Sequence, residues 1–148
     1  MVETRPGVVS LLLALLCAGC AGPSLVRDLE KRGVTYQNTE KIIVQDSEGG
    51  WGADTIVVLS DEFAIQTVWD AIYQARPYSQ WVASGYREIR FYTASRADKP
   101  NVILRQNASD EVHLKGLTAR DGYRCPGLFD YLTPFLEHEY EKREAGVR

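Results

Sequence analysis

The sequence predicts an α+β protein with a mostly antiparallel sheet of about five strands and helices packed on one face of that sheet. Two observations lead to this fold class. Short runs rich in β-branched residues alternate with turn formers, which is typical of strands that pair with their neighbours. Longer segments place apolar residues three and four positions apart, which indicates amphipathic helices. The predicted order of elements is αββαβββα.

Length and composition favour a single domain. The chain has 148 residues, of which 45% are hydrophobic and 25% charged, the profile of a globular protein. We divide it into a signal peptide over residues 1–19, a lipid-attachment segment with a short helix over 20–40, and one α+β domain over 41–148. The net charge of −3, without long runs of like charge, gives no electrostatic reason to expect a nucleic-acid partner.

A short helix and a hairpin are expected first. Residues 25–32 are suited to the helix, with Ser24 as N-cap and Gly33 as the left-handed residue that follows it. Residues 41–46 and 54–60 are β-branched runs on either side of a glycine-rich loop. Two such runs around a glycine-rich connection predict a β-hairpin.

The clearest helix is predicted over residues 61–76. Ser60 or Asp61 is suited to cap it, and Pro77 is expected to stop it. Its apolar face is formed by Ile65, Val68, Trp69 and Ile72.

Three further strands are predicted over residues 86–94, 101–106 and 111–117, joined by short connections rich in turn formers. The first of them alternates between two faces, so one face is expected to be buried and the other to meet water. One side carries Arg87, Ile89, Phe91 and Thr93, and the other carries Tyr86, Glu88, Arg90 and Tyr92.

The last predicted element is a helix over about residues 128–143. Its apolar face consists of Leu128, Leu132, Phe135 and Leu136. Pro134 has no N–H to donate and its ring crowds the preceding turn, so we expect a kink there, or a new start with Thr133 as N-cap.

The N-terminus has the sequence features of a signal peptide. Arg5 lies in a short polar opening, and the apolar run Val8–Leu16 ends in the small residues around Cys20. A helix that spans a bilayer needs about 20 apolar residues, so this run is too short to stay as an ordinary membrane anchor.

The segment Ala18, Gly19, Cys20 resembles the lipobox of bacterial lipoproteins, although Cys17 stands where that family prefers a larger aliphatic residue. The resemblance covers only the leader and implies that Cys20 becomes the first mature residue and carries acyl chains such as palmitate. Ala21 is not the aspartate associated with inner-membrane retention, which favours the outer membrane. The alternative is cleavage after Ala21, which releases a soluble periplasmic or secreted protein.

One pair of residues suggests catalysis. Cys125 and His113 are the residue types of a thiol nucleophile and its base, with Asp110 or Asp121 to orient the imidazole. No family motif surrounds the cysteine, so we expect it to be structural. A small envelope hydrolase or thiol enzyme is kept as the alternative function.

No cofactor or metal is expected. Asp46, Glu48 and Asp54 bracket a glycine-rich loop, but they lack the ligand spacing of a calcium-binding loop. His113 and His138 are too few, beside one thiol, for a closed zinc site. The tripeptide that begins at Asn107 matches a glycosylation acceptor, which we interpret as chance.

Aromatic and arginine side chains suggest a binding surface, because such residues are enriched where proteins meet partners. The first hypothesis is a non-enzymatic, membrane-tethered binding or accessory module of the cell envelope, which meets an envelope protein or glycan through the wet sheet face and nearby loops. A purely structural lipoprotein is a further alternative. The candidate binding residues are Trp51, Tyr78, Trp81, Arg87 and Arg90.

Overall fold

The computed structural model describes residues 24–46, 54–78, 87–116 and 122–146. The predicted signal peptide, Cys20, Trp51 and Trp81 lie outside these residues. In chain order the elements are α2 (Leu25–Glu30), β1 (Thr39–Asp46), β2 (Ile56–Leu59), α3 (Glu62–Tyr73), β3 (Arg76–Tyr78), β4 (Arg87–Thr93), the 3₁₀ turn η1 (Ala94–Arg96), β5 (Val102–Gln106), β6 (Glu111–Leu114), β7 (Gly122–Arg124) and α4 (Leu128–Glu144).

The α+β class is confirmed, but the strand count is higher than predicted. The described strands form one seven-stranded sheet in the order β2-β1-β4-β5-β6-β7-β3. Every neighbouring pair is antiparallel. The two strands that the sequence did not predict are β3 and β7, which have three residues each and pair with one another.

The end of α3 and the start of β3 differ from the sequence prediction for a local reason. The helix was expected to reach residue 76 but ends at Tyr73, and Pro77 lies inside β3 instead of in a loop. A residue before proline is disfavoured in the α region, so Arg76 takes an extended conformation. Since β3 is an edge strand, the missing N–H of Pro77 costs the sheet little.

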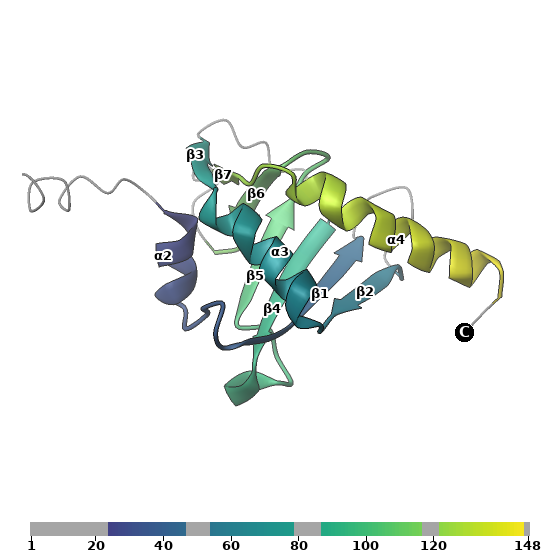
Figure 1. Cartoon of the computed structure of the whole chain (residues 1–148), viewed down its shortest axis with the longest axis horizontal. Coiled ribbons are helices and arrows are strands. Elements are labelled where there is room, and N and C mark those ends of the chain that lie inside the picture. The colour runs from purple at the N-terminus through teal and green to yellow at the C-terminus, as the bar shows by residue number, and fades with distance from the viewer. Residues whose placement is uncertain (1–23, 47–53, 79–86, 117–121, 147–148) are drawn as a thin grey trace, which may run out of the picture.

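Helices α3 and α4 lie on the same face of the sheet, here called the inner face, and α3 carries the chain across it from β2 to β3 (Figure 1). Asp61 caps α3, because its carboxylate accepts a hydrogen bond of 2.9 Å from the backbone N–H of Ala64. The ring of Trp69 packs edge-on against Phe91 of β4, with centroids 5.9 Å apart. The predicted apolar face of this helix is confirmed, since Ile65, Val68, Trp69 and Ile72 are buried.

Helix α2 belongs to the same core. Leu25 and Leu29 are fully buried, and α2 packs against α3. As predicted, Ser24 is its N-cap and Gly33 adopts a positive φ of 79°. The hydroxyl of Tyr123 donates a hydrogen bond to Asp28, which connects α2 to β7.

Helix α4 runs through Pro134 without a new start. Thr133 does not act as an N-cap, because its hydroxyl donates a 2.8 Å hydrogen bond to the carbonyl of Phe129 one turn back. The N-terminus is capped from a distance instead, since the carboxylate of Asp110 accepts hydrogen bonds from the backbone N–H groups of Gly127 and Phe129. Phe135 also departs from the predicted buried face, with 36% of its surface exposed. The buried line follows the four-residue spacing of Leu128, Leu132 and Leu136.

A row of polar side chains crosses the inner face beneath the first turns of α4. Asp46, Arg87 and Gln106 are cross-strand neighbours on β1, β4 and β5, and all are buried. The guanidinium of Arg87 donates hydrogen bonds to the carbonyl of Phe129 at 3.3 Å and the hydroxyl of Thr133 at 3.1 Å. It also stacks on the ring of Phe129 at 4.1 Å. Burial lowers the pKa of Arg87, and the charge of Asp46 opposes that shift.

This placement predicts that two arginines on the same strand contribute very differently to stability. Replacing Arg87 with Gln removes the contacts to α4 and the positive charge that faces the buried Asp46. We therefore expect the free energy of unfolding to fall by about 3 kcal/mol or more. Arg90 pairs with Glu88 on the opposite face, and Arg90→Gln is expected to cost about 1 kcal/mol or less. Urea unfolding of both variants measures the difference, and equal losses would contradict the placement of Arg87.

Candidate functional site

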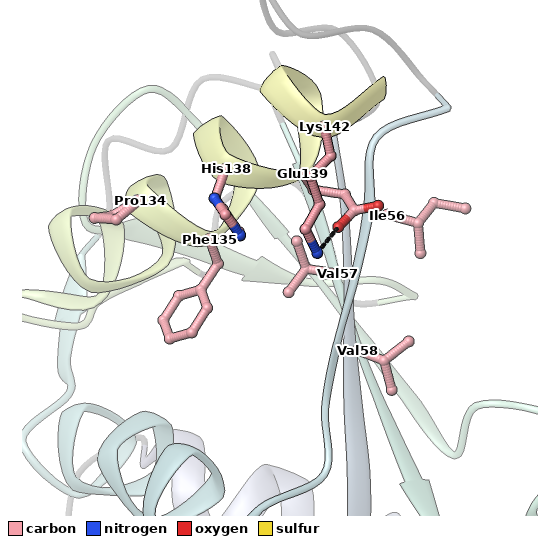
Figure 2. Close-up of a pocket in the computed structure, with 8 residues that line it drawn as sticks. All are labelled: Ile56, Val57, Val58, Pro134, Phe135, His138, Glu139 and Lys142. Carbon is pink, nitrogen blue, oxygen red and sulfur yellow. Dashed lines mark ion pairs between the residues drawn. The ribbon is translucent and has the colours of Figure 1, made fainter. Parts of the chain in front are cut away.

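An apolar groove separates the edge strand β2 from α4 (Figure 2). Its volume is about 640 Å³. Ile56 and Val58 are 43% and 55% exposed, which is unusual for large apolar side chains on a strand that also packs against a core. The β2–α4 groove is lined by Ile56, Val57, Val58, Pro134, Phe135, His138, Glu139 and Lys142.

Among the residues that the structure describes, the backbone of β2 is hydrogen-bonded on the β1 side only. The N–H of Asp46 on β1 donates to the carbonyl of Thr55. This bond shows which residues of β2 direct their backbone groups toward β1. Backbone groups in an antiparallel ladder alternate in direction, so Val57 and Leu59 also face β1, while Ile56 and Val58 point their N–H and C=O groups away from it. Because β2 is the outermost strand, the groups of Ile56 and Val58 form an open edge beside the groove.

The two edges of the sheet differ in how they are protected. At the far edge, β3 is three residues long and contains Pro77, which has no N–H to offer. Short strands and proline are two of the devices by which proteins prevent further strand pairing. The run Ile56–Leu59 contains neither a proline nor a charge. Of the two edges of the described sheet, the unprotected one therefore lies beside the groove.

Contacts at both ends hold α4 in place along this edge. Near its start, Arg87 and Asp110 bind its first turns. Near its end, Arg143 donates a 2.9 Å hydrogen bond to the hydroxyl of Thr55, and its guanidinium lies 3.7 Å from the carboxylate of Asp54. Thr55 comes directly before β2, so the end of the helix is tied to the strand that forms the other wall.

The polar rim of the groove comes from α4. Glu139 and Lys142 form an ion pair at 3.7 Å, and His138 lies beside them (Figure 2). Over its whole length α4 carries five carboxylates and two cationic residues. Asp54 and Asp61 add acidic groups at the two ends of β2. The two charged residues that line the groove therefore balance one another, and Asp54 is paired with Arg143, but acids outnumber cations over α4 and the two ends of β2 taken together.

The outer face of the sheet, away from α3 and α4, carries a charge network centred on Glu88. Its carboxylate accepts two hydrogen bonds from Arg90, the shorter at 2.7 Å. Arg105 and Lys115 approach the same carboxylate to 3.9 Å. Three cationic residues, on β4, on β5 and directly after β6, thus share one acid, which offsets only one of their three positive charges.

The candidate binding residues suggested by the sequence do not come together. Tyr78 and Arg90 both lie on the outer face, but four strand spacings separate β3 from β4, about 19 Å. Tyr78 is covered by the guanidinium of Arg124 at 4.4 Å. Arg87 is only 2% exposed and belongs to the core, so it cannot meet a partner on the wet face. Trp51 and Trp81 lie outside the described residues.

The possible nucleophile and base lie on opposite sides of the sheet. Cys125 is fully buried in the inner-face core, whereas His113 is on the outer side of β6 across from Arg105. Burial, reinforced by the charge of Asp110, raises the pKa of the Cys125 thiol to about 12. This thiol stays protonated at neutral pH, and the arrangement gives no support to a thiol enzyme at this position.

Within the described ranges, no three His, Cys, Asp or Glu side chains cluster as metal ligands. Nor does any helix there have the length and apolarity needed to cross a bilayer. Comparison with known protein families, with curated proteins and with solved structures finds no match.

The groove residues were not predicted as a site. One signal was present in the run Ile56, Val57, Val58, Leu59, which is apolar on both faces of the strand instead of alternating. Such a run indicates either a strand buried on both faces or an exposed apolar surface. Phe135 gave no separate signal, because its spacing is also compatible with the buried face of α4.

The state of Cys125 leads to a labelling prediction. In a variant that carries Cys17→Ser and Cys20→Ser, Cys125 is the one remaining thiol. We expect this thiol to stay unmodified by a water-soluble disulfide reagent at neutral pH, and to react fully once guanidinium unfolds the protein. The reagent absorbance measures both states. Rapid reaction in the native protein would show that the thiol is accessible and ionised, contrary to its position in the core.

Proposed function

We propose that the protein is an exported lipoprotein, anchored through Cys20, whose folded domain is a non-enzymatic binding module of the cell envelope. The apolar run Val8–Leu16 followed by Ala18, Gly19 and Cys20 supports export and lipidation. Ala21 supports the outer membrane as the site of the anchor.

The binding role rests on one observation, the β2–α4 groove beside an open strand edge. Exposed Ile56, Val58 and Phe135 line a concave surface, and no other described strand pairs with the adjacent backbone groups of β2. Apolar concave surfaces with convergent polar groups are where proteins bind partners. The outer face around Glu88 is a weaker candidate for an apolar partner, because the side chains that cover it there are charged.

Lipidation at Cys20 would confine this module to the membrane surface. One acyl chain gives only marginal binding, at about 0.8 kcal/mol per buried methylene, while two or three chains make the attachment effectively permanent. Five residue steps separate Cys20 from Leu25 at the start of α2. An extended chain of that length reaches at most about 18 Å, so the domain would work close to the headgroups.

Substitution of Cys20 tests whether the protein is lipidated and attached to the membrane. In a Gram-negative host fed an alkyne-labelled fatty acid, we expect the unmodified protein to incorporate the label and to remain with the membrane fraction. Cys20→Ser should lose both properties, because no thiol remains to accept a diacylglycerol. Cys17→Leu is the matched control and should keep both, since it places a preferred residue three positions before Cys20. A protein that is unlabelled and soluble without detergent would overturn the proposed anchor.

A further inference from the structure

We propose that the β2–α4 groove binds an extended segment of another protein, which adds to the sheet as an eighth strand beside β2 and carries cationic residues on either side of an apolar run. This inference deepens the binding role proposed above by naming the chemistry of the partner. It does not depend on the lipid anchor.

The backbone of β2 provides the first part of the argument. Ile56 and Val58 each direct one N–H and one C=O group out of the sheet, and no backbone or side-chain group of the described residues pairs with them. Only an extended chain offers donors and acceptors at the spacing of a strand, because its own groups repeat every second residue. A helix or a compact side chain cannot satisfy this edge.

The side chains around the edge select an alternating sequence. Residues of an added strand that lie level with Ile56 and Val58 share the outer face with these two exposed side chains. The residues between them point to the inner face and enter the space under Phe135 and His138 of α4 (Figure 2). Apolar residues on the inner side of the added strand would therefore fill the groove.

The charges around the groove select the flanks of the partner. Asp54 precedes β2 with 90% of its side chain exposed, and Glu62, which is exposed, follows the strand at the start of α3. The facing helix has an excess of carboxylates. Lysine or arginine on both sides of the apolar run would lie near these acids, and the attraction would weaken as salt is added.

The same acids disfavour a second copy of this chain as the occupant. An antiparallel pair of β2 strands that keeps Ile56 and Val58 hydrogen-bonded would bring Asp54 of one copy next to the Ser60–Asp61 end of the other. In that register Asp54 lies opposite Ser60, one position from Asp61, so the two acids repel one another across the strand pair. A cationic partner removes this repulsion, which is why we assign the groove to a different protein.

A synthetic peptide tests the proposal directly. The probe is a short blocked peptide in which valines alternate with threonines between flanking lysines, carries a fluorophore, and is titrated with the full-length protein in detergent. We expect saturable binding by fluorescence anisotropy that weakens with added salt. The same peptide with glutamates in place of the lysines should bind much more weakly, because it meets the acids around the groove.

Two variants at one position separate the backbone from the side chain. Val58→Pro removes the outward N–H of the edge without touching the bonds to β1, and edge strands tolerate such a proline. Losing one hydrogen bond should weaken peptide binding by about fivefold or more. Val58→Thr keeps the N–H and the branched shape, so it should bind the peptide much as the unmodified protein does. Unchanged urea midpoints for both variants show that the fold is kept.

Four outcomes would overturn the proposal. These are no binding of the lysine-flanked peptide, equal binding of the glutamate-flanked peptide, unchanged binding by Val58→Pro, and a dimer in sedimentation that Val58→Pro abolishes. The last would identify a second copy as the occupant. None of them affects the test of Cys20, and a protein that proves not to be lipidated can still bind the peptide, so the two proposals fail separately.

Discussion

The side chain of Arg87 connects the centre of the sheet to α4, and the shape of the molecule near β2 depends on that connection. A buried guanidinium is stable only where its donors and charge are met, and here Phe129, Thr133 and Asp46 meet them. These contacts fix the first turns of α4 over β4. Arg143 then fixes the other end of the helix to Thr55, so α4 follows one line from the middle of the sheet to its edge.

The position of α4 decides which part of the sheet stays uncovered. Leu128, Leu132 and Leu136 complete the core. Phe135 lies beside this row of leucines and lines the groove together with β2. The edge strand therefore has α4 over one face and, within the described part of the chain, no neighbouring strand on its outer edge. At the opposite edge a proline ends the sheet. This asymmetry links the packing of the core to the proposed function, because it leaves one edge of the described sheet where a further strand fits.

Much of the fold follows from local patterns in the sequence, and most of the site does not. The alternation along β4 separated the buried Ile89 and Phe91 from the half-buried Glu88 and Arg90, although Tyr92 on the second side is buried as well. The apolar face of α3 was predicted fully, since each pattern depends only on neighbours in the chain. Strands β3 and β7 are too short to show a period, and their pairing joins distant segments. Arg87 lies in register with Ile89 and Phe91, but its charge suggested the surface, because its partners on α4 are 42 and 46 residues away. The groove depends on the same long-range placement of α4.

The open edge of β2 is tested most directly by hydrogen exchange of its four amides, followed by NMR in the free protein. We expect the amides of Ile56 and Val58 to exchange nearly as fast as in an unfolded chain. Those of Val57 and Leu59, which face β1, should exchange roughly tenfold more slowly or slower still. Strong protection of all four amides would mean that the edge is already covered, and the groove would then have no room for another strand.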